Sequence, residues 1–84
     1  MNVHEAITKH SNAQHMHLVH FAELDAQREE AIEAAVELCR RGLPFTVDAI
    51  NDVTAKIIAH AKEGISPLRS YVTEDMVRDY VNKG

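Results

Sequence analysis

Apolar residues recur through the first forty positions at the three- and four-residue spacing of one helical face. At about 100° per residue, this phase holds from residue 3 to residue 39 without a reset. No glycine or proline occurs before Gly42, and Pro44 follows it as a further stop signal. The pattern predicts one helix over about residues 3–41. Its apolar face carries Val3, Ile7, Leu18, Phe21, Leu24, Ile32, Ala35, Val36 and Cys39.

A second helix is predicted over about residues 47–63. Thr46 suits its N-cap, because a threonine hydroxyl can accept a hydrogen bond from a free amide of the first turn. Apolar residues again recur at helical spacing. Gly64 repeats the helix-ending signal of Gly42, so this helix should end in the same way.

Two further helical elements are predicted after the second helix. A Ser-Pro pair favours a short helical turn over about residues 67–71. A threonine cap then precedes a last helix over about residues 74–82, whose first turn is acidic, as the helix dipole favours. No alternating strand pattern and no internal repeat occurs in the sequence. We therefore expect a single all-α domain over residues 1–84.

The long helix presents more apolar surface than the rest of the chain can cover. It should be about 55 Å long, whereas the second and last helices should span about 24 Å and about 14 Å. An apolar band of that length is rare on a monomer, and long periodic helices usually find a partner helix. We therefore predict a helical-bundle homodimer. Either the two long helices pair, with an antiparallel direction favoured, or the N-terminal half of each docks on the other subunit. The interface candidates are Ile7, His10, Gln14, His17, Leu18, Phe21 and Leu24.

One alternative changes this architecture. Asp25 could cap a new helix, in which case the first segment would fold back and a monomeric four-helix arrangement would result. Nothing near Asp25 forbids helix, so we favour the continuous rod.

Four of the six histidines fall in the stretch "HSNAQHMHLVHF" at residues 10–21. Two histidines on one helix chelate a metal when they lie four, or sometimes three, residues apart. His17 and His20 have the second spacing, and Glu23 extends the candidate metal set. Each step turns about 60° around the helix, so the three side chains converge poorly. We expect no metal and no cofactor; a metal site shared across a dimer axis is the alternative.

Composition narrows the partners further. The chain has nine lysines and arginines and thirteen acidic residues. Neither half of the chain has the excess of basic residues that phosphate binding requires, so we expect no nucleic-acid partner. One cysteine rules out an intrachain disulfide and fits a reducing cytoplasm. No apolar run is long enough for a signal peptide or a membrane span. The sequence predicts a cytoplasmic protein that does not contact the membrane.

Catalytic signatures are not found in the sequence. The three glycines lie at helix or chain ends, the serines and threonines mostly at helix caps, and the glutamates on a solvated face. We therefore expect no catalytic or cofactor-binding residue, and a protein that is not an enzyme. A small non-catalytic interaction or structural protein, self-associating through its N-terminal helix, is the predicted function.

A DNA-associated or metal-responsive regulator is the alternative function. It would use the helices over residues 47–82 or the histidine-rich N-terminal helix. "PFTVDAINDVTAKI" resembles the first helix of many repressor motifs, with a later helix at "TEDMVRDYV". The connection between them is longer than a helix-turn-helix turn, and the later helix is acidic, which repels phosphate.

Three segments, "VHEAITKHS", "PFTVDAIN" and "VTEDMVRDYV", resemble a small family of uncharacterised proteins from Bacillus-type bacteria, the YpbS-like proteins. The resemblance spans nearly the whole chain. It implies a small cytosolic bacterial protein rather than a fragment of an enzyme. It brings no activity, cofactor or partner, so no functional residue is carried over from it.

Overall fold

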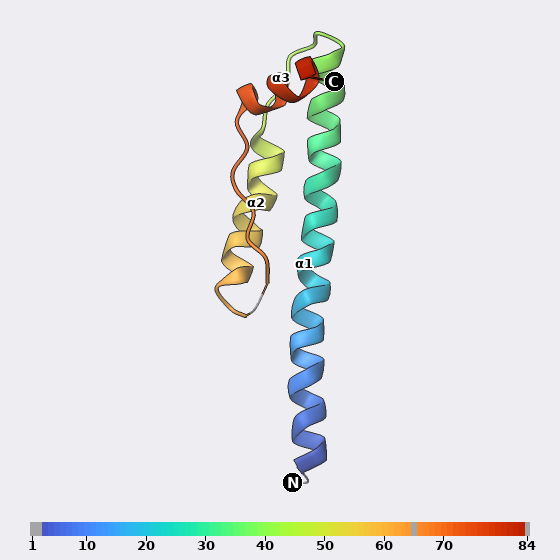
Figure 1. The fold of residues 1–84 in the computed structure, drawn as a ribbon, viewed down its shortest axis with the longest axis vertical. Helices are drawn as coiled ribbons and strands as arrows, with labels where there is room; N and C mark the ends of the chain where they lie inside the picture. The colour runs from blue at the N-terminus through green and yellow to red at the C-terminus, as the bar shows by residue number, and fades with distance from the viewer. Residues whose placement is uncertain (1–2, 65, 84) are drawn as a thin grey trace.

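The computed structural model describes residues 3–64 and 66–83, and for residues 3–13 it describes the backbone alone. These residues form three helices and no strand, which confirms the all-α prediction. The helices are α1 (Val3–Arg40), α2 (Asp48–Ala61) and α3 (Glu74–Lys83). The molecule is elongated, measuring 61 × 19 × 17 Å. α2 runs back beside α1, and α3 lies near the C-terminal end of α1 (Figure 1).

α1 runs without interruption for 38 residues, so the predicted continuous rod is confirmed and the bend near Asp25 does not occur. Its end has the hydrogen-bond pattern of a Schellman motif. The amide of Gly42 donates to the carbonyl of Cys39 at 3.0 Å, and the amide of Leu43 donates to that of Leu38 at 3.0 Å. Gly42 has φ +70°, the left-handed conformation that a residue without Cβ adopts most easily.

α2 begins one residue later and ends two residues earlier than predicted. Val47, not Thr46, is its N-cap, and no side chain caps the first turn, so the predicted Thr46 cap is wrong. Val47 packs against the core. Gly64 does not adopt a left-handed conformation; α2 ends instead through Lys62, whose amide donates to the carbonyl of Ala59 at 3.2 Å.

The short helical turn predicted over residues 67–71 is wrong, because residues 66–73 form an irregular strap. Side chains from both long helices hold the strap backbone in place. Arg28 Nη2 donates to the carbonyl of Ser70 at 3.0 Å. The Asn51 amide group donates to the carbonyl of Val72 at 2.8 Å and accepts from the amide of Val72 at 2.8 Å. These tertiary hydrogen bonds replace those that a local helical turn would have made.

The strap also carries an ion pair to the middle of α1. Arg69 reaches Asp25 with two contacts, Nε to Oδ1 at 3.0 Å and Nη2 to Oδ2 at 3.4 Å. The Arg69 guanidinium lies 5.2 Å from the centroid of the Phe21 ring. Asp25, which could have capped a new helix, thus anchors the strap. α3 then begins after Thr73, whose hydroxyl accepts from the amide of Met76 at 3.2 Å, as predicted for its cap.

The core lies between the C-terminal half of α1 and the two shorter helices. Ala35, Val36, Ile50 and Val77 form its buried cluster. One buried polar group, Thr54, is fully satisfied: its hydroxyl donates to the carbonyl of Ile50 at 2.9 Å and accepts from Arg28 Nε at 3.0 Å. Leu24, Ala35 and Val36 of the predicted apolar face of α1 are buried, whereas Leu18 on the same face is 43% exposed.

The N-terminal third of α1 extends beyond everything that packs on the rest of the helix (Figure 1). Near the end of α2, the carbonyl of His17 accepts from His60 Nε2 at 2.8 Å. Residues 3–16 continue past this contact for about 21 Å. In a single chain, α1 is therefore longer than the part of it on which α2 and α3 pack, as the sequence predicts.

Candidate functional site

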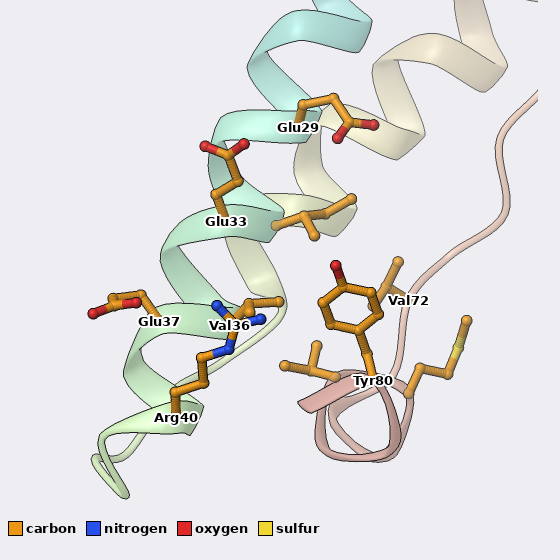
Figure 2. Close-up of a pocket in the computed structure, with 10 residues that line it drawn as sticks. Glu29, Glu33, Val36, Glu37, Arg40, Val72 and Tyr80 are labelled. Carbon is orange, nitrogen blue, oxygen red and sulfur yellow. The ribbon is translucent and has the colours of Figure 1, made fainter. Parts of the chain in front are cut away.

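A groove of about 540 Å³ lies between α1 and α3 (Figure 2). One wall is a row of carboxylates along α1, Glu29, Glu33 and Glu37, each four residues from the next and therefore on one side of the helix. Arg40 ends this row. Tyr80 stands on the opposite side, on α3 (Figure 2).

The floor of the groove is apolar. It is formed by Ile32 and Val36 of α1, Val72 of the strap and Val77 of α3. Met76 lies at the edge with 51% of its surface exposed, and Tyr80 is 61% exposed. An apolar floor beside an acidic wall favours an occupant that offers both apolar and positively charged side chains.

Carboxylates, a guanidinium and a phenol line the groove, and among the residues that the structure describes no serine, cysteine or histidine does. The described lining therefore lacks the pair of nucleophile and base that covalent catalysis needs. Its apolar and charged side chains are of the kinds that contact a bound protein. Sequence reasoning placed the glutamates on a solvated face and did not foresee the groove, because that requires knowing where α3 packs.

The predicted interface residues divide into three groups. Leu24 is buried within the chain itself. His17 and Phe21 face the chain's own α2 and strap, through His60 and Arg69. Leu18 is 43% exposed. Gln14 is half-buried, and the side chains of Ile7 and His10 lie outside the described residues. The fold therefore occupies the inner part of the predicted interface.

A cluster of three histidines marks the end of the α1–α2 contact. The rings of His17 and His60 stack, with centroids 3.7 Å apart and planes 18° apart. The ring of His20 meets His60 edge-on at 4.7 Å. His17 Nε2 is buried and has no hydrogen-bond partner within the described part of the chain. A Cβ at Gly64 would lie 2.9 Å from this atom, so the backbone approaches His17 closely at this point.

The candidate metal set is not assembled in this cluster. His20 Nδ1 lies 3.9 Å from Glu23 Oε2, but His17 turns away to stack on His60. Within the residues that the structure describes, no group of three histidine, cysteine or acidic side chains is placed to hold a metal ion. The partners of His60 are 40 and 43 positions away in the sequence, so no local pattern could identify them.

Comparison with known proteins identifies relatives without assigning an activity. A family described as "Protein of unknown function (DUF2533)" matches residues 1–83. The uncharacterized protein YpbS of Bacillus subtilis (strain 168) is 48% identical over 81 residues, which are 96% of this chain and 95% of that protein. The resemblance to the YpbS-like proteins is thus confirmed. No solved structure matches the chain. In the described part of the chain, no helix has both the length and the apolar character needed to cross a membrane.

Proposed function

The chain belongs to the DUF2533 family, whose description names no activity, and we propose from its shape that it is a non-catalytic helical interaction protein. It self-associates through the N-terminal part of α1 and works in the cytoplasm. The observation that carries this proposal is that the backbone of residues 3–13 extends beyond the end of α2 (Figure 1).

This uncovered segment is a poor helix on its own. Isolated helices shorter than about 12–15 residues are marginal in water even when alanine-rich. Here the stretch includes Ser11 and Asn12, which have low helix propensity, and three histidines. A second surface that packs on residues 3–16 would supply the stability that local propensity does not.

The exposed apolar residues next to this segment favour a protein partner. Leu18 is 43% exposed in the single chain. On the helix, Ile7 and Leu18 lie within about 20° of the direction of Val36, which lines the groove. An exposed apolar side chain such as Leu18 on this face of the helix is typical of a helix-pairing surface.

Light scattering on the purified, tag-free protein tests the proposal. We expect a solution mass of twice the 9.4 kDa of the chain. Replacing Leu18 with glutamate should raise the dimer dissociation constant about 10- to 100-fold, because an apolar contact worth about 1.5–3 kcal/mol is lost. Met16→Glu is the matched control: Met16 is 61% exposed and lies about 160° away around the helix, so its replacement should leave the mass unchanged. A wild-type mass of one chain would contradict the proposal.

The regulator alternative has less support from the described residues. α2 and α3 are separated by the strap, which is longer than a helix-turn-helix turn. Arg78, the arginine of α3, is held by Asp75 at 2.8 Å and by Glu74 at 3.4 Å, so its charge is already balanced. A gel shift on nonspecific DNA at low salt tests this alternative, since even weak DNA binders are retained there.

A further inference from the structure

We propose that the groove between α1 and α3 receives residues 3–13 of α1 from a second copy of the chain. Each chain would then both donate its N-terminal segment and receive that of its partner, giving a closed antiparallel dimer. This inference rests on the proposed self-association and adds to it a direction, a register and a receiving site.

The first argument is one of length. When two helices spanning residues 3–40 overlap fully in opposite directions, residue 3 of one lies level with residue 40 of the other. Residue 7 is then level with residue 36, and residue 14 with residue 29. Residues 3–13, whose backbone extends beyond α2 (Figure 1), are thus level with residues 30–40, within the stretch from Glu29 to Arg40 that lines the groove. The extended segment and the groove match in length and in position.

The second argument is the direction in which the groove opens. Around the helix axis, positions 7, 11 and 18 lie within about 40° of Glu29 and Val36. The same side of α1 therefore lines the groove in the C-terminal half of the helix. In the N-terminal half it carries a row of mostly uncharged residues. Since one face serves both roles, two copies can pair by a two-fold axis without either helix having to turn.

The third argument is charge. The groove wall holds three glutamates, and the structure describes an ion pair for one of them, Glu37 with Arg41. The first 22 residues contain one acidic residue, Glu5, against Lys9 and five histidines. When the two helices overlap fully, His15 is level with position 28 of the partner chain, one residue from Glu29. The donated segment thus avoids like-charge contact with the wall, as complementary interfaces do.

The fourth argument is the apolar content on both sides. Met76 and Tyr80 remain more than half exposed at the edge of the groove, although both are large and apolar over most of their surface. Isoleucine at position 7 falls level with Val36 at the groove floor. Aromatic residues and methionine are enriched in interface cores. A helix seated here would cover the two residues that α3 leaves exposed.

Intermolecular paramagnetic relaxation tests the register directly. One sample carries Cys39→Ala and Asn12→Cys with a nitroxide at position 12, which lies beside the contact face rather than on it. It is mixed with ¹⁵N-labelled Cys39→Ala protein, so that every loss of amide signal reports on the other chain. We expect losses at residues 29–36 and along the groove side of α3. The solution mass of both samples is measured in parallel.

The outcomes separate the two proposals. Losses at residues 8–16 of the labelled chain would mean parallel pairing, and losses confined to α2 would mean a different surface; either overturns the groove assignment. A dimer mass without losses also overturns it but leaves self-association standing. A mass of one chain overturns both, and would leave the groove to a partner of another kind.

Charge reversal supplies a second readout with a matched control. Glu29→Lys places a positive charge on the wall that faces His15, and should raise the dimer dissociation constant up to about fivefold. Glu30→Lys makes the same change one residue away, on the exposed outer side of α1, and should leave the constant unchanged. Equal effects of the two variants would contradict the groove assignment.

Discussion

The two parts of α1 are one continuous helix, yet they are stabilised in different ways. From His17 to Arg40, the helix is covered by α2, the strap and α3, and its inward residues are buried or paired. The backbone of residues 3–13 extends beyond the end of α2, and no other element is drawn beside it (Figure 1). Helical geometry is the same in both parts, but the core and the strap pack on the C-terminal part.

The contrast shows what continuity of a hydrophobic stripe does and does not imply. The stripe extends over both parts, but the single chain uses it only where α2 and α3 reach. In most proteins helical stability comes from packing an amphipathic face rather than from propensity. The uncovered part should therefore depend on a second chain, whereas the covered part should not.

The largest expected effect lies in the covered part. Ile57 is fully buried, with 0% of its surface exposed. Ile57→Ala should lower the free energy of unfolding by about 2–5 kcal/mol, the cost of a cavity that the surroundings fill incompletely. Met16→Ala, in the uncovered part, should change it by less than about 0.5 kcal/mol. Urea unfolding followed by circular dichroism measures both. A comparable loss in the two variants would remove the distinction between the two parts.

A smaller effect is expected where side chains hold the strap. Arg28→Met removes the hydrogen bonds to the Thr54 hydroxyl and to the Ser70 carbonyl while keeping an aliphatic side chain. The free energy of unfolding should fall by about 1–3 kcal/mol. Arg41→Met, which breaks an exposed pair with Glu37, is the control and should cost less than about 1 kcal/mol. If both variants cost the same, the strap does not depend on Arg28.

The smallest effect is expected at the boundary between the two parts. Gly64→Ala brings a Cβ within 2.9 Å of His17 Nε2, and the stacked ring must shift. We expect a loss of about 1 kcal/mol from this overpacking. In a His17→Ala background the obstacle is gone, so the same change should cost nothing or stabilise slightly. An equal cost in both backgrounds would show that the close approach to His17 is not its cause.

The elements that local chemistry determines could be predicted from the sequence. Gly42 ends α1 because its φ of +70° suits glycine, and Leu43 completes the hydrogen-bond pattern there. Thr73 caps α3 through its own hydroxyl. The length of α1 follows from an unbroken phase with no helix breaker. In each case the deciding interactions join residues a few positions apart.

The features that were predicted wrongly or not predicted depend on contacts between residues far apart in the sequence. The strap is not helical because Arg28 and Asn51 bond its backbone from 42 and 21 positions away. Val47, which packs against the core, is the N-cap of α2 in place of Thr46. The groove exists because α3 packs beside the glutamate row of α1. None of these contacts has a periodicity that a sequence pattern could reveal.

Amide hydrogen exchange along α1, measured at low and at high protein concentration, tests the central claim most directly. If a second chain covers residues 3–16, their protection must increase with concentration more than that of residues 17–40, which the chain covers by itself. Protection of residues 3–16 that stays the same across this range, whether weak or strong, would contradict the account.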